Sequence, residues 1–326
     1  MIRAMDVVGN PSSVHGEGRA AKGLIERARG QVAQALGADG ADVIFTSGAT
    51  EAAALACADR GLCGAAVEHD AIKAWITADL PVDALGHVAV SNPAQSVLQL
   101  ANSETGVVQE LPEGLAMSDM TQGFGKLPLA FNWSGCQMAI VSGHKLGGPK
   151  GIGALVVKRG TDVAAQIKGG GQEMGRRSGT ENLIGIAGFG AAAEASMRDL
   201  FDGIWERVSE FRKILEKVVA AEAKETIFVG KDSTRLPNTL CMVTPGWKGE
   251  TQVMAMDLAG FAVSSGSACS SGKVRASGTL EAMGIAPENA ACALRVSLGP
   301  DTTEDDVMRF SEAWLKQLNK HRARAA

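Results

Sequence analysis

Residues 139–145 read Ala-Ile-Val-Ser-Gly-His-Lys, and this stretch decides the fold that we expect for the chain. Three apolar residues suited to a buried strand run directly into polar and small ones, and Leu-Gly-Gly-Pro at 146–149 indicates a turn. The strand would deliver Lys145 to its own C-terminal end, where open α/β sheets bind ligands. An amine held among apolar residues loses hydration, so its pKa falls and it can form a Schiff base with a carbonyl. For an isolated lysine, the alternative is a solvated surface side chain.

Upstream of Lys145, four other apolar segments end in polar residues. Repetition of strand, polar tip and helix is typical of a parallel sheet whose active site lies along one edge, so an α/β fold is predicted. The polar tips are Thr46 to Glu51, Glu68 to Asp70, Asn102 to Gly106, and Ser118 to Gln122.

Two of the turns have residues suited to an anion. Gly48 lies between a strand and an Ala-rich helix that begins near Glu51, where free N–H groups and the hydroxyl of Thr50 could hold a phosphate. A capped helix without a ligand is the alternative. Further on, Arg176 and Arg177 precede Thr180 near the expected start of another helix. This basic pair is suited to an anion or, alternatively, forms a solvated charged turn.

Composition favours a cytoplasmic enzyme that acts on a small molecule. The net charge of the 326 residues is −4 with a pI near 5.8, which gives no basic excess for nucleic acid. Apolar runs stay below the roughly 18 residues that span a bilayer, and the N-terminus does not resemble a signal peptide, so no membrane partner is expected. Six cysteines without a CxxC pair argue against a metal site and against a disulfide framework.

We expect two domains, a large one over residues 10–200 and a smaller α+β domain over residues 201–326, with residues 1–9 packing near the smaller one. In the smaller domain Cys269 lies among serines, alanine and glycines. These surroundings predict an accessible thiol that could serve as a nucleophile or carry sulfur. Arg295 lies inside an alternating strand and needs a carboxylate partner, from the protein or from a substrate.

The ordered set of motifs resembles the cysteine desulfurases, pyridoxal-phosphate enzymes of the class V aminotransferase group, and specifically those with a long mobile sulfur-carrying loop. The resemblance implies a fold type I architecture, with a mostly parallel seven-stranded sheet flanked by helices and a smaller α+β C-terminal domain. The matching segments are Gly9 to His15, Thr46 to Glu51, Glu68-His69, Ser142 to Lys145, Arg177 to Thr180, Leu236 to Thr239 and Gly266 to Cys269.

The resemblance also implies a role for each candidate residue. Lys145 would bind pyridoxal 5'-phosphate covalently and move a proton, Asp119 would pair with the ring nitrogen, and His69 would stack on the ring as an acid or base. Arg295 would hold the substrate carboxylate, with Asn102 beside the substrate. The remaining cofactor contacts would be Gln122 to the phenolic oxygen, Thr50, Ser142 and His144 to the phosphate, Thr180 from the partner subunit of a homodimer, and Ala49 and Ser103.

By the same resemblance, the reaction would convert L-cysteine to L-alanine. Cys269 would attack the sulfur of the bound substrate and become a persulfide. A sulfur-acceptor protein, such as an iron–sulfur scaffold, is the implied partner.

Two departures from the family pattern keep alternatives open. The chain begins after the family's first strand and its Asn-Ala-Thr-Thr-like motif, and Ser103 stands where the family carries an Asn that contacts the cofactor. The alternatives are a selenocysteine lyase or another class V enzyme with the same cofactor site, or a noncatalytic dimeric scaffold.

Overall fold

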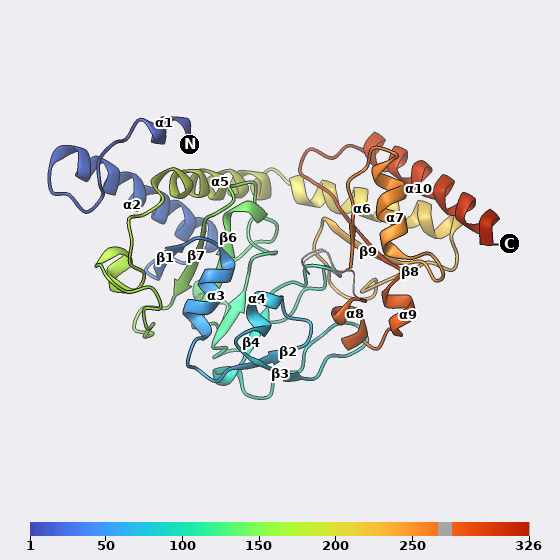
Figure 1. Ribbon diagram of the computed structural model, residues 1–326, viewed down its shortest axis with the longest axis horizontal. Coiled ribbons are helices and arrows are strands. Elements are labelled where there is room, and N and C mark those ends of the chain that lie inside the picture. Colours follow the sequence, from blue (N-terminus) through green and yellow to red (C-terminus); the bar gives the residue numbers. More distant parts are fainter. Residues whose placement is uncertain (267–275, 326) are drawn as a thin grey trace. The chain divides into compact units, whose positions relative to one another are not determined.

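The computed structural model describes residues 1–266 and 276–325, whose helices and strands are shown in Figure 1. The chain forms two compact units. The first contains Met1–Leu80, Val90–Leu100 and Gln109–Asp202, and the second contains Pro81–Ala89, Ala101–Val108 and Gly203–Ala326.

A five-stranded sheet organises the first unit. Its strands are β1 (Asp42–Thr46), β4 (Val97–Gln99), β5 (Met117–Asp119), β6 (Met138–Ser142) and β7 (Gly153–Val157), in the order β1-β7-β6-β5-β4. The neighbours β4, β5 and β6 run parallel, whereas β7 runs antiparallel to both β6 and β1.

A parallel pair, β2 (Cys63–Ala65) and β3 (Thr77–Leu80), extends this sheet, because a parallel bridge joins Cys63 to Ser96 beside β4. The described part of the first unit therefore has a seven-stranded, mostly parallel arrangement, and the predicted α/β class is confirmed. The antiparallel direction of β7 was not predicted.

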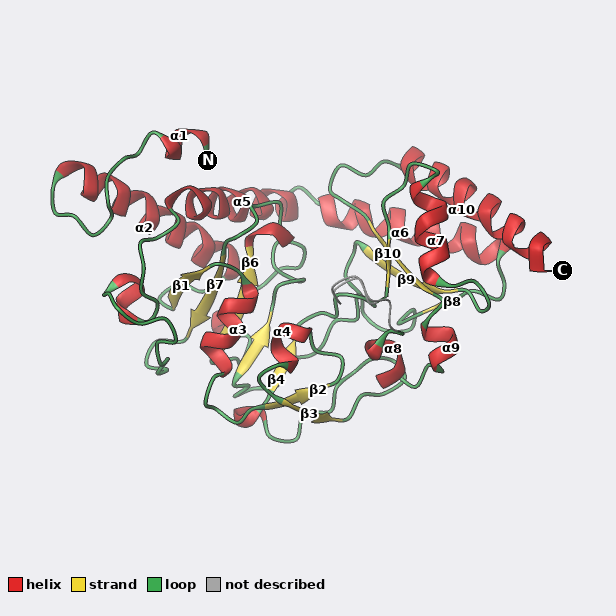
Figure 2. Ribbon diagram, viewed as in Figure 1, coloured by secondary structure: helices red, strands yellow, loops and turns green. Residues whose placement is uncertain are grey.

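Helices cover both faces of this sheet. The long helices are α2 (Gly16–Leu36), α3 (Ala49–Cys57) and α5 (Leu183–Phe201). Ile44 of β1 packs in the same core cluster as α3, whereas the ring of Phe45 lies 6.4 Å from that of Phe189 on α5. Because successive strand residues point to opposite faces, α3 and α5 cover opposite faces of the sheet. Figure 2 shows α2 and α5 side by side.

The remaining helical segments of the first unit are short. They are α1 (Ile2–Met5), α4 (Asp70–Lys73) and the 3-10 turns η1 (Pro93–Gln95), η2 (Phe131–Trp133), η3 (Gly143–Lys145) and η4 (Gln172–Gly175).

The second unit is α+β. Its antiparallel strands β8 (Ile227–Phe228), β9 (Thr239–Val243), β10 (Ser264–Ser265) and β11 (Ala293–Ser297) form a sheet in the order β10-β11-β9-β8. Its helices are α6 (Ile204–Glu222), α7 (Gly249–Asp257), α8 (Gly278–Ala282), α9 (Pro287–Ala290) and α10 (Glu304–Ala325).

The core of the second unit is built around two tryptophans. The rings of Trp247 and Trp314 lie 5.5 Å apart. The buried Gln252 accepts a hydrogen bond from Trp314 Nε1 at 3.1 Å and donates to the Trp247 carbonyl at 2.8 Å. The buried amide of Gln252 and the indole N–H of Trp314 therefore have partners, as burial requires. Among the described helices of the chain, none is long and apolar enough to cross a membrane.

Gly153 has no side chain, and this allows the turn after β1 to approach its backbone closely at the edge of the first unit's sheet. Gly153 pairs with Thr46 of β1 on one side and with Ser142 of β6 on the other. A Cβ placed at Gly153 would lie 2.8 Å from the backbone of Gly48 and 2.7 Å from the Val141 carbonyl. The turn after β1 therefore folds over the start of β7, between the ends of two strands.

Replacing Gly153 by Ala should destabilise the protein, because the contacts are with backbone atoms and no rotamer change relieves them. We expect a loss of about 1 to 3 kcal/mol in the free energy of unfolding, measured by urea denaturation. Gly30→Ala on the exposed side of α2 is the control, since a Cβ there has open space. It should stabilise by about 0.5 to 1 kcal/mol. Equal stability of Gly153→Ala and the parent chain would contradict the close approach.

Candidate active site

Asp119 and Lys145 lie at the same edge of the sheet. Asp119 ends β5, and Lys145 follows the end of the parallel neighbour β6 in the turn η3. Burial raises the pKa of the Asp119 carboxyl. Hydrogen bonds from Thr121, whose N–H donates at 2.9 Å, and the charges of His69 and Lys145 oppose this rise. A carboxylate, an amine and an imidazole are thus brought within electrostatic range.

His69 is exposed and caps a short helix. Its Nδ1 accepts a hydrogen bond from the backbone N–H of Ala71 at 3.1 Å, at the start of α4. When the ring is neutral, the proton therefore lies on Nε2. In this state Nε2 is a hydrogen-bond donor.

A second group of polar residues follows β1 and β6. Thr50 is exposed in the first turn of α3, where backbone N–H groups lack helical partners, and Ala49 begins that helix. Ser142 Oγ lies 2.8 Å from His144 Nδ1. The close approach at Gly153 brings the turn after β1 next to the strand that ends in Ser142. These residues suit an anion at the sheet edge.

The environment of His144 favours the neutral imidazole. Partial burial lowers its pKa, and the charges of Lys145 and Lys150 lower it further. A neutral ring joined to Ser142 can still donate one hydrogen bond to an anion.

Gln122 lies in the turn after β5 and is half-buried. Its backbone carbonyl accepts a hydrogen bond at 3.0 Å from Lys126 Nζ. The same ammonium donates to the Lys145 carbonyl at 2.9 Å. Sequence reasoning missed Lys126, because its burial depends on packing between two turns that are far apart in the chain.

Glu68 is a second buried ionisable group beside the site. Only 2% of the residue is exposed, and Oε1 accepts a hydrogen bond from the Gln99 backbone N–H at 2.8 Å. Oε2 has no hydrogen-bond partner in the described part of the chain. Burial, together with the charge of Asp119, raises the pKa of Glu68 to about 8. The carboxyl is therefore mainly protonated at neutral pH, and Asp119 is the stronger candidate for the ionised carboxylate.

Three ion pairs anchor the loop that carries Thr180. Arg29 Nη1 lies 2.7 Å from Glu173, Arg176 lies 2.7 Å from Asp42, and Arg177 lies 2.8 Å from Glu51. The basic pair at 176 and 177 therefore binds carboxylates of its own chain, which the sequence did not predict.

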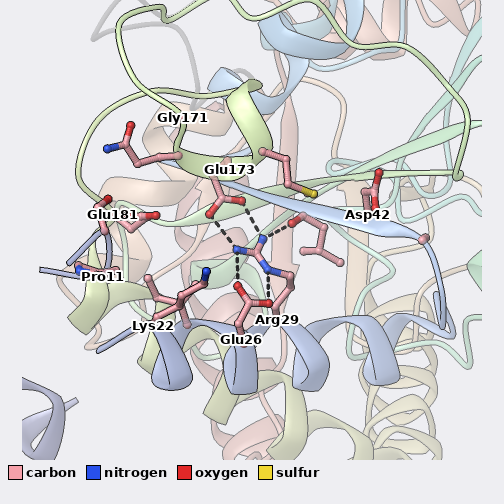
Figure 3. Close-up of a pocket in the computed structure, with 14 residues that line it drawn as sticks. Pro11, Lys22, Glu26, Arg29, Asp42, Gly171, Glu173 and Glu181 are labelled. Carbon is pink, nitrogen blue, oxygen red and sulfur yellow. Dashed lines mark hydrogen bonds and ion pairs between the residues drawn. The ribbon is translucent and has the colours of Figure 1, made fainter. Parts of the chain in front are cut away.

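The Arg29–Glu173 pair is the most buried of the three, and Figure 3 shows it between α2 and the loop. Glu173 also accepts a hydrogen bond from the Phe45 backbone N–H at 3.0 Å. Glu173 and Met174 have positive φ angles of 47° and 59°, a conformation that is costly for side chains with a Cβ. The ion pair thus holds a strained turn in place, while Thr180 at the far end of the loop is exposed.

The second unit contains the candidate substrate residues. Arg295 on β11 donates to the Ser103 carbonyl at 2.9 Å and to Ser264 Oγ at 3.2 Å. Within the described residues no carboxylate lies within ion-pair distance of Arg295, and its buried Nε has no hydrogen-bond partner. The guanidinium therefore retains donor capacity for a carboxylate ligand.

Asn102 is buried and shapes the adjacent turn. Its Oδ1 accepts hydrogen bonds at 2.9 Å from the backbone N–H groups of Glu104 and Thr105. Ser103 supplies its carbonyl to Arg295. Cys269 lies outside the described residues. Among those that are described, no group of three or more His, Cys, Asp or Glu side chains is arranged to hold a metal ion.

Comparison with known proteins gives consistent matches over most of the chain. The family described as "Aminotransferase class-V" matches residues 3–97 and 90–310. A "Cysteine desulfurase" of Cereibacter sphaeroides is 36% identical, over 93% of this chain and 87% of that protein. "Cysteine desulfurase IscS 1" of Archaeoglobus fulgidus is 33% identical, over 93% and 88%.

A solved structure has the same fold. It is that of a NifS-like protein from Rickettsia africae, which superposes with a TM-score of 0.88 and 32% sequence identity. The match covers 98% of this chain and 94% of the other.

Replacing Glu173 by Gln should destabilise the protein, because the shape is kept while Arg29 loses its buried counter-charge. We expect a loss of about 3 kcal/mol in the free energy of unfolding, at the low end for a broken buried pair since Glu26 also contacts Arg29. Limited proteolysis should also cleave the loop 168–181 faster. The control is Glu210→Gln, the same change in an exposed pair with Lys213, which should leave the unfolding midpoint unchanged. Equal effects of the two changes would contradict the anchoring role.

The raised pKa of Glu68 predicts a pH-dependent difference between the parent chain and Glu68→Gln. In the unfolded chain Glu68 ionises near its ordinary pKa of 4.5, whereas in the folded chain it keeps its proton up to about pH 8. The protonated carboxyl of Glu68 therefore contributes its whole share of the free energy of unfolding below about pH 4.5, and this contribution is lost as the pH rises to about 8.

Between these limits, the stability of the parent relative to Glu68→Gln should fall by about 1.4 kcal/mol per pH unit. Urea unfolding of both proteins at several pH values measures this slope. Parallel stability curves would show that Glu68 ionises normally.

Proposed function

Because the chain belongs to the class V aminotransferase family, and within it to the cysteine desulfurases, we propose that it removes sulfur from L-cysteine with pyridoxal phosphate held at Lys145 and Asp119. One observation of the structure supports the choice of Lys145 and Asp119. Asp119 ends β5, Lys145 lies in the turn that follows the adjacent parallel strand β6, and their side chains interact electrostatically.

The residues around this pair fit the cofactor. Lys145 would bind its aldehyde carbon, and Asp119 would keep its ring nitrogen protonated. Thr50, Ser142 and His144 offer hydrogen-bond donors for its phosphate, and Gln122 offers an amide for its phenolic oxygen. When bound, pyridoxal phosphate supplies an electron sink that stabilises negative charge on the substrate carbon.

The chain's own groups would then orient the substrate and move its protons. Arg295 is suited to hold the substrate carboxylate, since its guanidinium has no carboxylate partner among the described residues. Lys145 would take the proton from the substrate α-carbon and return a proton to the product. His69 would act as an acid or a base.

Cys269 would receive the sulfur. The carbon–sulfur bond of cysteine breaks, a sulfur–sulfur bond to the thiolate of Cys269 forms, and the substrate carbon gains a proton to give L-alanine. The resulting persulfide can be passed to an acceptor protein, for which an iron–sulfur scaffold is our proposal. We also propose a homodimer in which the exposed Thr180 contacts the cofactor phosphate of the partner subunit.

The test measures alanine and persulfide separately. Lys145→Ala should lower alanine release from cysteine by at least about a hundredfold, the contribution of a positioned acid or base, and should also end covalent cofactor attachment. Borohydride reduction followed by mass spectrometry of the peptide that contains residue 145 detects that attachment.

Cys269→Ala should abolish persulfide formation, while Cys63→Ala, a change of a half-buried cysteine in the first unit, should leave it unchanged. Cofactor attached at another lysine would overturn the assignment of Lys145. Persulfide that survives in Cys269→Ala would overturn the assignment of Cys269. A chain that binds the cofactor but never releases alanine would favour a noncatalytic scaffold.

A further inference from the structure

Glu104 is a buried carboxyl group of the second unit that the proposed reaction does not use. Only 6% of the residue is exposed. Its Oε2 accepts a hydrogen bond from the hydroxyl of Ser277 at 2.6 Å, the short length typical of a hydroxyl bound to a carboxylate. Its Oε1 lies against the backbone of Gly266, where an added Cβ would be 2.3 Å from that oxygen and 3.0 Å from the Cβ of Ser277. One side chain therefore contacts two residues that are well separated in the sequence.

These two residues flank residues 267–275, the segment that carries Cys269. The segment follows Gly266 directly, and Ala276 separates its end from Ser277. The segment itself lies outside the described residues. Because Cys269 is the third residue after Gly266, its α-carbon can lie at most about 11 Å from that of Gly266, whatever path the chain takes. The position of Gly266 therefore limits how far the thiol can reach.

Neighbours of Glu104 and of Gly266 both bind Arg295. The guanidinium of Arg295 donates to the carbonyl of Ser103 at 2.9 Å and to Ser264 Oγ at 3.2 Å. Ser103 directly precedes Glu104. Ser264 lies two residues before Gly266 and pairs with Arg295 where β10 meets β11. The start of the segment with Cys269 is thus linked to the arginine that we propose holds the substrate carboxylate.

We propose that Glu104 is a positioning residue that holds the start of the segment with Cys269 in a fixed place relative to Arg295. The hydroxyl of Ser277 orients the carboxyl group, and the carboxyl group supports the backbone of Gly266. A thiol that attacks the sulfur of a substrate held by its carboxylate must lie within a narrow range of distances. Fixing Gly266 narrows the positions open to that thiol. The inference rests on the proposed roles of Arg295 and Cys269.

Two substitutions should disturb this arrangement in different ways. Ser277→Ala removes the hydroxyl that binds Glu104. Gly266→Ala should force the carboxyl group to move, because the clashing oxygen is the end of a flexible side chain whereas the new Cβ is fixed by the backbone. Should one variant fail to fold, the other still tests the proposal.

Hydrogen–deuterium exchange of the cofactor-free full chain tests the contact itself. Each variant is measured on the far side of the segment from its own substitution. Ser277→Ala should speed amide exchange at residues 264–266, and Gly266→Ala should speed it at residues 277–282. We expect about a tenfold change, the effect of losing one hydrogen bond to a charged group. Unchanged exchange on the far side in a folded variant would overturn the proposal.

Two measurements on the enzyme loaded with pyridoxal phosphate separate the position of the thiol from the rest of the site. Exchange of the α-proton of alanine in deuterium oxide, followed by NMR, needs Lys145 and Arg295 but no thiol, so it should stay at the parent rate. The initial rate of persulfide formation on Cys269 should fall about ten- to a hundredfold in both variants, as expected for a misplaced reactive group. Equal losses in the two rates, or no loss of persulfide, would overturn the proposed role.

Each substitution has a matched control in the second unit. Ser277 also caps α8, because its Oγ accepts a hydrogen bond from the Leu280 N–H at 3.1 Å. Thr303→Ala removes a hydroxyl that binds the Asp306 N–H at the start of α10 in the same way. Gly278→Ala adds a Cβ in open space beside Ser277. Neither control should change exchange at residues 264–266 or the rate of persulfide formation.

Failure of the underlying function has a different signature. A parent chain that exchanges the α-proton of alanine but forms no persulfide on Cys269 would refute the function on which the inference rests. The amide exchange results are independent of that outcome, because they require neither cofactor nor substrate.

Discussion

The parallel alignment of β4, β5 and β6 is the constraint on which the candidate site depends. Parallel neighbours end at the same edge of a sheet, so residues that follow each strand converge although they are far apart in the sequence. Asp119 and Lys145 meet in this way. The antiparallel β7 then places Gly153 between the ends of β1 and β6, where the absence of a side chain admits the turn at Gly48. The backbone of the sheet thus positions both ends of the proposed cofactor site.

Glu68 and Asp119 differ in how readily they ionise, and this difference sets the charge at this edge of the sheet. Burial raises the pKa of both Glu68 and Asp119, but the groups that oppose the rise differ. Asp119 accepts hydrogen bonds from Thr121 and faces His69 and Lys145, whereas Glu68 accepts one from a backbone N–H and has Lys73 as its nearby cation. Environments that separate two carboxyl groups in this way assign them different roles. Glu68 can stay neutral while Asp119 carries the negative charge, which is the charge that the proposed pairing with a ring nitrogen requires.

Local patterns in the sequence were sufficient for the α/β class and for strands with polar tips, since both follow from apolar runs that end in polar residues. They could not give the direction of β7, because an apolar run such as Gly153–Val157 has the same composition in either orientation. Nor could they show that Arg176 and Arg177 bind Asp42 and Glu51, since these partners lie more than a hundred residues away. The burial of Lys126 and of Glu68 could not be predicted for the same reason. A charged residue in a sequence looks solvated, and only the packing of distant turns shows that it is buried.

The loop that carries Thr180 is held in place by ion pairs that do not themselves contact the proposed cofactor site. Its strained residues, Glu173 and Met174, would relax in a free loop, because a left-handed backbone is unfavourable for both. The carboxylate of Glu173 binds Arg29 on α2 and the N–H of Phe45 on β1, and Arg177 binds Glu51 at the start of α3. Glu51 in turn accepts from the N–H of Ser47. The loop and the turn of Thr50 are therefore both held by bonds around β1. In the proposed homodimer, a subunit that docks on Thr180 would be oriented by the same strand that leads into the proposed phosphate site.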